Sequence, residues 1–339
     1  MQDHFSTAES SRHGPTRSSR TTCTGWHRFL STTGASRGIG LEIGKLLASK
    51  GANVAVAAKT AEPHAKLPGT IFTAVEEIEK IGKENNYNSV RGLPLQVDIR
   101  DAEKVEDAIQ KTIDKFGNLD IIINNASAIN MSSTLQAKPK SYDLMNSINV
   151  KGTWLVSKFA LPHLLKSAEQ GRNPHILTLS PPLHLNLFQP FTQNRKDDSG
   201  DQFKQVGAAY SVSKLGMSIA TYALAAETFG KVACNTLWPY TLIGTSAMKI
   251  VSPNAEIEER RWRSPSIVAE AAIRILEQDA KTFSGQMLVD ELYLREHGFN
   301  NEQLKEFSLG GRDIKFDELA EDLFISKTLR DEIVSKRGT

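Results

Sequence analysis

The sequence predicts one α/β domain, a doubly wound parallel sheet with helices on both faces. Short apolar segments, typical of buried parallel strands, alternate along the chain with longer segments whose apolar residues recur at the 3.6-residue period of a helix. Neither an internal repeat nor a linker interrupts this alternation between residues 26 and 300. We therefore expect a single domain there, preceded by a tail at 1–25 and followed by a helical extension at 301–339.

Six of the expected strands are short apolar segments, whereas the first is polar. The six lie at 54–58, 93–97, 120–124, 175–180, 232–238 and 286–290. The first strand should lie at 26–32, where only Trp26, Phe29 and Leu30 are large and apolar. Central parallel strands are usually continuous apolar runs, so this segment predicts a poor central strand. A misread start of the gene before Thr33 is an alternative explanation.

Helices with a 3.6-residue period fill the gaps between the strands. The clearest of them span 41–50, 102–116, 141–165, 210–229 and 266–278. In the extension, the stretches FDELAEDLF at 316–324 and KTLRDEIVSK at 327–336 predict short amphipathic helices that pack on the domain. The polar stretch at 193–205 is interpreted as a surface insertion.

The composition favours small-molecule chemistry. Of 339 residues, 40% are hydrophobic, which is sufficient for a sizeable core. Because 41 basic residues nearly balance 39 acidic ones, the net charge of +2 offers no field for nucleic acid or an anionic membrane. No apolar run reaches the ~18 residues of a membrane span. Cys23 and Cys234 match no metal-binding or disulfide spacing, so we expect no metal and a reducing intracellular compartment.

The first 25 residues are rich in Ser, Thr and Arg, which predicts a disordered tail. A mitochondrial transit peptide is the alternative, although Asp3 and Glu9 argue against it. The C-terminal Arg-Gly-Thr is not a peroxisomal signal.

A glycine loop, TGASRGIG at 33–40, lies where the first strand should pass into the helix at 41. Glycines allow a tight turn and close approach of a pyrophosphate, and the N-terminus of the helix offers free N–H groups to the phosphates. This pattern predicts a dinucleotide site, with a simple tight turn as the alternative.

The loop has the spacing G-x-x-x-G-x-G, and it is followed by NNAS at 124–127, Asn149 in a helix and YSVSK at 210–214. With these four elements, residues 29–292 resemble the short-chain dehydrogenase/reductase family, and the resemblance implies a Rossmann-type fold and a homodimer or homotetramer. It also implies that Asp98 binds the adenine and that Asn125 and Ala126 border the nucleoside. It assigns the phosphate cradle to Gly34, Ala35, Ser36, Arg37, Gly38, Ile39 and Gly40.

Four further stretches are similar to an animal subgroup of this family. They are AAKTAEPHAKLPGTI at 57–71, LSPPL at 179–183, Trp-Pro at 238–239 and RSPSIVAEAA at 263–272. Members of that subgroup also carry a sterol-carrier domain, which we do not expect in this chain. A peroxisomal location is suggested by this resemblance alone.

The charges near the second strand favour NADP over NAD. An NAD enzyme places a carboxylate after this strand for the ribose 2′-hydroxyl, and that carboxylate would repel a 2′-phosphate. Here Lys59 follows the strand and Arg37 lies in the glycine loop, so two cations are available for the phosphate. The alternative is that Lys59 is an ordinary surface lysine.

Tyr210 and Lys214 are four residues apart on an expected helix, so they lie on one face. A neighbouring ammonium stabilises a phenolate and lowers its pKa, which would let Tyr210 exchange a proton with a carbonyl or an alcohol. The resemblance implies that Lys214 also holds the nicotinamide ribose and that Asn149 steadies the helix and a proton-relay water.

Ser180 ends the fifth apolar strand, and Pro181 follows it. The family usually has two serines here, of which the second orients the substrate oxygen. Because a shift of one residue turns a side chain to the opposite face of a sheet, Ser180 need not replace the serine lost at Pro181. Apolar residues at 183–191 either line a pocket for an apolar substrate or pack as an ordinary loop.

We therefore expect an NADP-dependent oxidoreductase that interconverts a ketone and a secondary alcohol on a small, apolar or lipid-like substrate. One alternative is a weakly catalytic or non-catalytic nucleotide-binding regulatory protein of the same fold, and Pro181 and the polar first strand motivate it. An epimerase or dehydratase is a further alternative, which the loop spacing disfavours.

Overall fold

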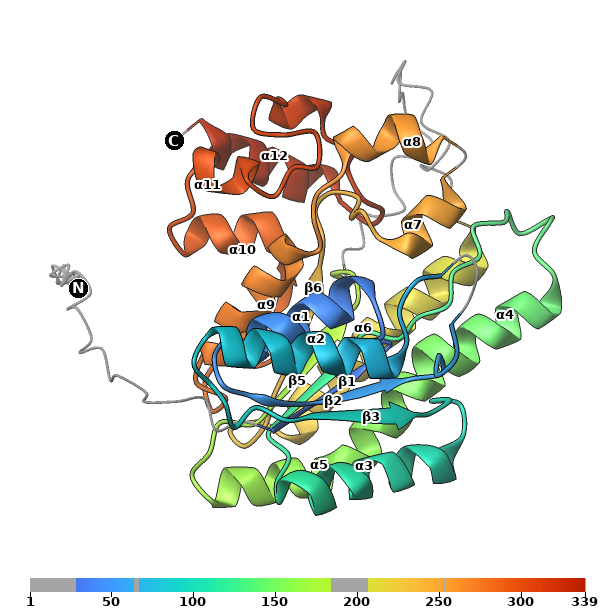
Figure 1. Ribbon diagram of the computed structural model, residues 1–339. Coiled ribbons are helices and arrows are strands. Elements are labelled where there is room, and N and C mark those ends of the chain that lie inside the picture. Colours follow the sequence, from blue (N-terminus) through green and yellow to red (C-terminus); the bar gives the residue numbers. More distant parts are fainter. Residues whose placement is uncertain (1–28, 64–66, 184–206, 253, 339) are drawn as a thin grey trace, which may run out of the picture.

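Seven parallel strands form one sheet in the order β3-β2-β1-β4-β5-β6-β7 (Figure 1). The computed structural model describes residues 29–63, 67–183, 207–252 and 254–338. The predicted tail, the insertion at 193–205 and nearly all of 183–191 lie outside the described residues. The doubly wound α/β fold is confirmed. The strands are β1 (Phe29–Thr33), β2 (Asn53–Ala58), β3 (Gly92–Gln96), β4 (Ile121–Asn124), β5 (His175–Leu179), β6 (Ala233–Trp238) and β7 (Met287–Val289).

Helices cover both faces of the sheet. Along β4, Ile121 and Ile123 face a core shared with α1, α2 and α9, whereas Ile122 faces a core shared with α3, α5 and α6. This alternation is what a strand buried on both faces requires. Of the expected helices, 41–50, 102–116, 210–229 and 266–278 are confirmed. The α-helices up to β7 are α1 (Gly38–Ala48), α2 (Ile71–Glu84), α3 (Ala102–Phe116), α4 (Pro139–Met145), α5 (Thr153–Glu169), α6 (Ala208–Glu227), α7 (Ser246–Val251), α8 (Ala255–Glu258) and α9 (Ser266–Glu277).

The helix expected at 141–165 is divided. A π-helical segment, Asn146–Gly152, separates α4 from α5, and Asn149 lies at its middle, fully buried. Such segments are rare and occur frequently at functional sites. Periodicity could not predict this one, because one widened turn leaves the apolar pattern on either side unchanged.

The prediction that the first strand is a poor central strand is wrong. β1 pairs in parallel with β2 on one side and with β4 on the other. Its residues Ser31, Thr32 and Thr33 are small enough to be buried in the sheet. Thr33 accepts hydrogen bonds from the backbone amides of Asn125 and Ala126, over 3.0 and 3.1 Å, and so bonds the end of β1 to the end of β4. The Thr33 hydroxyl is tolerated at the end of this buried strand because these two amides bond to it.

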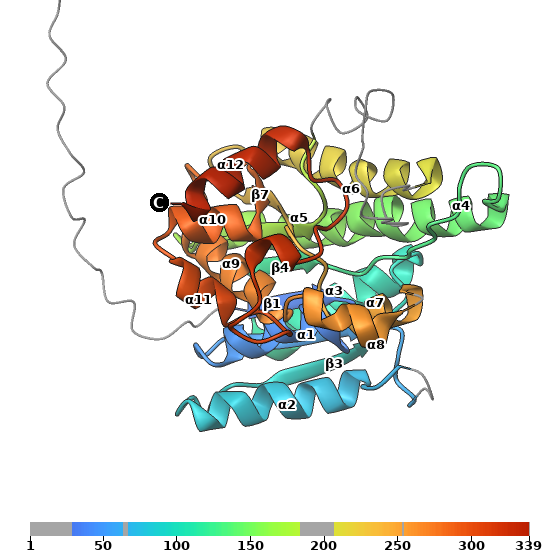
Figure 2. The same ribbon diagram turned by 90° about the horizontal axis from the view of Figure 1, so that it is seen from above.

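The chain after β7 lies above the carboxyl ends of the strands (Figures 1 and 2). The prediction for 327–336 is confirmed by α12, whereas the helix expected at 316–324 is wrong beyond its first turn. Around residues 320–322 the chain is extended, because the amide of Leu242 donates to the Ala320 carbonyl and the amide of Asp322 donates to the Tyr240 carbonyl. The chain then turns at Phe324, which has φ of 63°. The elements of this part are α10 (Asp290–Glu296), α11 (Asn301–Lys305), the 3₁₀ turn η6 (Phe316–Glu318) and α12 (Lys327–Arg337).

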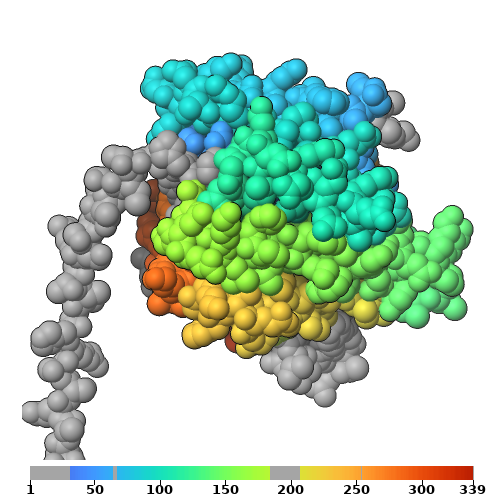
Figure 3. Space-filling model, turned by 90° about the horizontal axis from the view of Figure 1, so that it is seen from below, coloured from blue at the N-terminus to red at the C-terminus, as the bar shows by residue number. Residues whose placement is uncertain are grey.

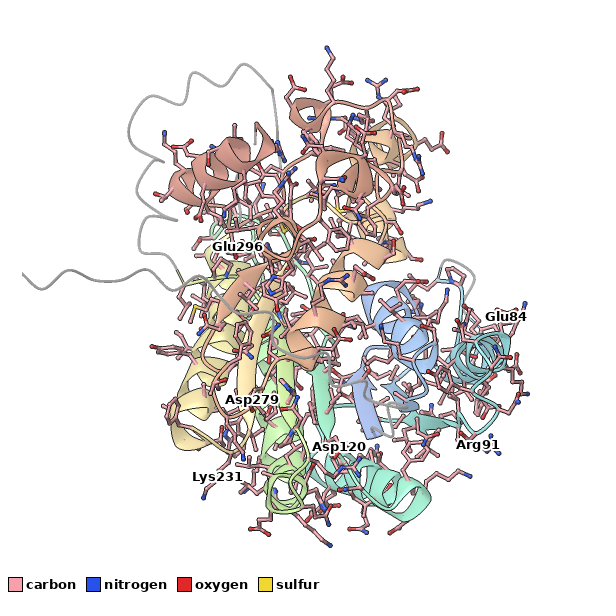
Figure 4. The ribbon with its side chains drawn as sticks, turned by 90° about the vertical axis from the view of Figure 1, so that its left-hand side faces the viewer. Glu84, Arg91, Asp120, Lys231, Asp279 and Glu296 are labelled. Atoms are coloured by element: carbon pink, nitrogen blue, oxygen red, sulfur yellow. The ribbon has the colours of Figure 1, made fainter. Side chains whose placement is uncertain are left out.

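The opposite end of the sheet carries the turns into the strands. Asp120 and Lys231, which precede β4 and β6, lie there, far from Glu296 at the end of α10 (Figure 4). Buried Asp120 is held by Arg172 at 2.5 Å and by the Ser167 hydroxyl at 2.6 Å. Within the part of the chain that the structure describes, no helix is long and apolar enough to cross a membrane.

Candidate active site

The predicted site residues lie along a groove and an adjoining cavity at the carboxyl ends of the strands. The glycine-loop groove, of about 560 Å³, is lined by residues after β1, β2, β3 and β4. The apolar cavity, of about 220 Å³, is lined by residues after β4 and β6, by the last residues of β5 and β6, and by α6. Ile39, Asn125, Ser127 and Thr245 line both, so the two spaces adjoin.

The glycine loop packs directly against the end of β4. Gly34 has φ of +64°, and a Cβ at this position would lie 2.9 Å from the Cα of Ala126. A Cβ at Gly40 would lie 2.6 Å from Asn125 Nδ2, the amide that donates to the carbonyls of Thr33 and Gly34. The motif NNAS thus fixes the shape of the loop, which explains physically why the two motifs occur together.

The predicted cofactor residues divide between the surface of the groove and the layer behind it. Ala35 and Gly40 do not line the groove, and both are buried. They support the loop from behind. Lys214 lines the adjoining apolar cavity instead. The remaining predicted residues line the groove, namely Gly34, Ser36, Arg37, Gly38, Ile39, Lys59, Asp98, Asn125 and Ala126.

Two cations, Arg37 and Lys59, line the groove, and a third, Arg100, binds the carboxylate of Asp98, which also lines it. Lys59 lies 3.2 Å from Asp98, and its side chain is 61% exposed. Arg100, which the sequence analysis missed, donates hydrogen bonds of 2.5 to 3.1 Å to both oxygens of the Asp98 carboxylate. These bonds hold the pKa of Asp98 well below its usual range. Arg37 donates to the backbone carbonyls of Pro68 and Gly69, each over 2.8 Å. Lys59 is therefore the cation with most freedom to reach a ligand.

Tyr210 and Lys214 lie one turn apart on α6 and line the apolar cavity. The Lys214 ammonium donates to the Leu179 carbonyl at the end of β5 over 2.7 Å, and it lies 5.1 Å from the centre of the Trp238 ring. Burial lowers the pKa of Lys214 to about 7, while the nearby carboxylate of Asp322 opposes this shift.

The expectation that Lys214 lowers the pKa of Tyr210 does not hold in this structure. Burial raises the pKa of the phenol above its usual range, and the charge of Asp322 raises it further. The ammonium of Lys214 donates its hydrogen bond to the Leu179 carbonyl instead. Tyr210 is thus arranged as a protonated donor.

Asn149 joins two parts of the site without lining the cavity. Its side chain accepts from the amide of Ala128 at 2.7 Å and donates to the carbonyl of Ala128 at 3.0 Å. It also donates to Ser213 Oγ at 2.9 Å, and Ser213 Oγ donates to the Tyr210 carbonyl at 2.8 Å. Asn149 therefore ties the loop after β4 to the turn of α6 that carries Tyr210 and Lys214.

Ser180 is buried directly after β5, and its hydroxyl has no hydrogen-bond partner among the described residues. Leu179 lines the apolar cavity, but Ser180 does not. The carbonyl of Pro181 accepts a hydrogen bond from Ser218 Oγ at 2.5 Å, which fixes the turn after the strand. Ser180 thus directly follows the residue that accepts the hydrogen bond from Lys214, while its own side chain is not among those that line the cavity.

Asp322 and Phe324 are residues of the site that the sequence analysis missed. Asp322 lines the apolar cavity, and the ring of Phe324 packs on Tyr210 with 6.1 Å between ring centres. Both lie in the stretch interpreted as an amphipathic helix, where an acidic residue is expected to face solvent. No local signal distinguishes this carboxylate from its neighbours, because contacts with Tyr240 and Trp238, distant in sequence, position it.

Comparisons with known proteins agree with this arrangement. A family model described as short chain dehydrogenase matches residues 29–179. A protein named hydroxysteroid dehydrogenase-like protein 2, from Danio rerio, is 45% identical over 269 residues, which are 79% of this chain. The chain spans 58% of the length of that relative.

Two solved structures match most of this chain. The crystal structure of a putative dehydrogenase from Xanthomonas campestris is 37% identical, with a TM-score of 0.73, and the match covers 89% of this chain and 98% of the other. That of a short chain dehydrogenase from Mycobacterium thermoresistibile is 38% identical, also with a TM-score of 0.73, and covers 88% and 95%. With this fold, these motifs and these relatives, the chain belongs to the short-chain dehydrogenase family of NAD(P)-dependent oxidoreductases.

Proposed function

We propose that the chain is an NADP-dependent oxidoreductase that interconverts a ketone and a secondary alcohol on an apolar or lipid-like substrate. The observation that carries the proposal is the continuity of the site. The glycine-loop groove adjoins an apolar cavity, and Tyr210 and Lys214 line that cavity. A dinucleotide in the groove would bring its reactive ring beside these two side chains.

The residues present fit a dinucleotide. The glycine loop keeps side chains out of the groove, and α1 begins at Gly38, so its free amides face that space. Exposed Lys59 supports a 2′-phosphate, and Asp98 and Asn125 line the groove where the adenine and the nucleoside would lie. Bound there, the nicotinamide cofactor supplies or accepts the hydride.

In the proposed reaction, Tyr210 supplies the proton. In reduction, its protonated phenol donates to the carbonyl oxygen of the substrate as that oxygen gains negative charge. In oxidation, the phenolate removes the proton from the alcohol. Lys214 binds the nicotinamide ribose, while Asn149 holds the turn of α6 that carries both residues.

The lining of the cavity supports an apolar substrate. Its wall is formed by aliphatic, aromatic and sulfur-containing side chains from the loops after β4 and β6 and from α7. Burial of apolar surface contributes about 25 cal/mol per Å², so such a wall selects hydrocarbon over polar groups. Examples of these side chains are Ile129, Met131, Trp238, Leu242 and Met248.

One observation favours a second candidate function, that of a weakly catalytic or non-catalytic nucleotide-binding regulatory protein. The buried hydroxyl of Ser180 is not among the groups that line the cavity. Losing a donor to a developing oxyanion costs about 100-fold to 1000-fold in turnover, so the chain could bind a dinucleotide and react slowly.

The test is cofactor binding followed by turnover on the same protein. NADPH and NADH are titrated first, and oxidation of NADPH is then followed with 2-decanone, cyclohexanone and a ketosteroid. Turnover that Tyr210→Phe lowers by at least about 100-fold, with unchanged NADPH binding, supports the enzyme. Tight NADPH binding without turnover of any probe favours the regulatory protein, and no dinucleotide binding contradicts both.

A further inference from the structure

A short segment, residues 67–70, lies against the glycine loop and is fastened to it by Arg37. Arg37 Nε donates to the carbonyl of Pro68 and Arg37 Nη2 donates to the carbonyl of Gly69, each over 2.8 Å. Two bonds from one planar guanidinium fix the direction of the segment as well as its distance. Because Arg37 directly precedes α1, these bonds join the start of α1 to the segment that leads into α2.

The backbone of the segment also contacts the glycine loop directly. Gly69 has φ of +86°, a conformation that residues with a side chain rarely adopt. A Cβ at this position would lie 2.7 Å from the carbonyl oxygen of Ser36, so no side chain fits between the two backbones. This close contact is a second attachment, independent of the bonds from Arg37.

Further hydrogen bonds hold the end of the connection between β2 and α2. The amide of Ile71 donates to the Thr60 carbonyl over 3.0 Å, which closes the connection at its base. Buried Thr70 caps α2, because its hydroxyl accepts from the Thr73 amide at 3.2 Å and its amide donates to the Thr73 hydroxyl at 2.8 Å. In turn, α2 shares a core with α1 (Figure 1). The segment thus has a fixed place beside the groove.

Leu67 brings this segment into the wall of the glycine-loop groove. It lines the groove together with Lys59 and Thr60, which follow β2, and with Val97 and Asp98, which follow β3. In the proposed function this end of the groove takes the adenosine, because Asp98 would bind the adenine there. A displacement of the segment would therefore change the width of the groove at that end.

We propose that Arg37 is a positioning residue of the dinucleotide site, which fastens residues 67–70 against the glycine loop and so sets the wall of the groove at its adenosine end. This role differs from the expected contact with a 2′-phosphate, because the guanidinium is already bonded to two carbonyls. The phosphate is then bound by Lys59, whose side chain is 61% exposed. The inference rests on the dinucleotide binding of the proposed function and adds the segment that holds the adenosine.

The test measures dissociation constants for NADPH, NADH and AMP by isothermal titration calorimetry. NADH and AMP have no 2′-phosphate, so a loss of their affinity cannot come from that group. Arg37→Gln removes the pair of bonds and should weaken all three ligands by a similar factor, roughly 10-fold. Arg37→Lys keeps the charge but not the planar pair of donors, so it should weaken all three as well.

Gly69→Ala tests the segment while Arg37 and its charge are retained. The added Cβ should push the segment away from Ser36 and weaken all three ligands in the same way. Gly117→Ala is the matched control, because Gly117 also has a positive φ, +82°, but a Cβ there would meet no neighbouring group within 4 Å. It should lower the thermal stability and leave the three dissociation constants unchanged.

The titration also separates positioning from a general loss of folding. A variant that had only lost stability would show fewer binding sites per chain at an unchanged dissociation constant. The two variants at Arg37 decide the question should Gly69→Ala fail to fold.

Two results would overturn the inference. One is a loss confined to NADPH in Arg37→Gln that Arg37→Lys restores, because Arg37 would then bind the 2′-phosphate. The other is a set of unchanged dissociation constants in Arg37→Gln or in folded Gly69→Ala. Failure of the wild-type protein to bind NADH or NADPH would instead contradict the proposed function, so the two failures are distinguishable.

Discussion

Lys214 donates a hydrogen bond of 2.7 Å to the backbone carbonyl of Leu179, so its ammonium is anchored to the end of the fifth strand. The bond offsets only part of the cost of burying the amine, because burial still lowers the pKa of Lys214 to about 7. An unfolded lysine titrates near ~10.4. Between these two values the unfolded chain binds more protons at this residue than the folded chain does.

This difference predicts a pH-dependent effect on stability. As the pH rises from 7 to about 10, the contribution of Lys214 to the free energy of unfolding should increase. Lys214→Met should therefore be more stable than wild type at pH 6, by more than about 1 kcal/mol, and this advantage should shrink at pH 9. Urea unfolding at both pH values measures it. Exposed Lys231→Met is the control, and a constant difference for Lys214→Met would contradict the shifted pKa.

Gly40 should be intolerant of a side chain. In Gly40→Ala, the Cβ would meet Asn125 Nδ2 at 2.6 Å and displace the amide that fixes the glycine loop. We expect a loss of at least about 10-fold in NADPH affinity, since each 1.4 kcal/mol is tenfold.

The control for Gly40 lies one turn further along the same helix. A Cβ at Gly44 would lie 3.3 Å from Cδ1 of Ile78, the end of a flexible side chain. Gly44→Ala should therefore fold and bind NADPH as wild type does. Equal affinities of both variants would show that the loop does not contact the cofactor. Fluorescence titration, with thermal unfolding as the check on folding, makes this comparison.

Lys59 should determine the preference between the two dinucleotides. If its exposed ammonium contacts the 2′-phosphate, Lys59→Ala should weaken NADPH by about 10-fold and leave NADH nearly unchanged, because such a charge-assisted bond contributes about 1.5–3 kcal/mol. Lys80→Ala is matched in charge and lies on the exposed side of α2. Parallel titrations with both dinucleotides measure the ratio, and an equal loss for both would argue against recognition of the phosphate.

One face of α5 and α6 should mediate self-association. The two helices lie side by side at the surface (Figure 3). Trp154, Ile219 and Tyr222 project from them with 47%, 58% and 56% of their areas exposed. Exposed apolar residues gathered in this way are typical of an interface. A homodimer or homotetramer remains a prediction from the family resemblance.

Light scattering after size exclusion tests this prediction. Ile219→Glu should shift the wild-type oligomer to a smaller species, because a buried charge would oppose association. Ile257→Glu, at an equally apolar and exposed position on α8, should leave the mass unchanged. A monomeric wild-type protein would contradict the prediction outright.

Local sequence patterns were sufficient to predict much of the structure of this protein. The alternation of strands and helices, the glycine loop and the spacing of Tyr210 and Lys214 are short-range features, and each appears in the structure where the sequence indicated. They could be predicted because a buried strand, a tight turn and one helical turn each leave a signature within a few residues. The polar strand β1 is the exception, since Thr33 is accommodated only by its bonds to Asn125 and Ala126.

Contacts between residues distant in sequence decided the rest. The amphipathic pattern at 316–324 predicts a helix. In the structure, however, hydrogen bonds with Tyr240 and Leu242 hold the chain extended there, and Asp322 lines the cavity. Likewise, the sequence placed Ser180 at the end of a strand, but only packing in three dimensions buried its hydroxyl without a hydrogen-bond partner among the described residues. The sequence by itself determined the fold and the reactive pair. The tertiary structure decided which charges surround that pair, because burial and proximity are properties of the folded chain.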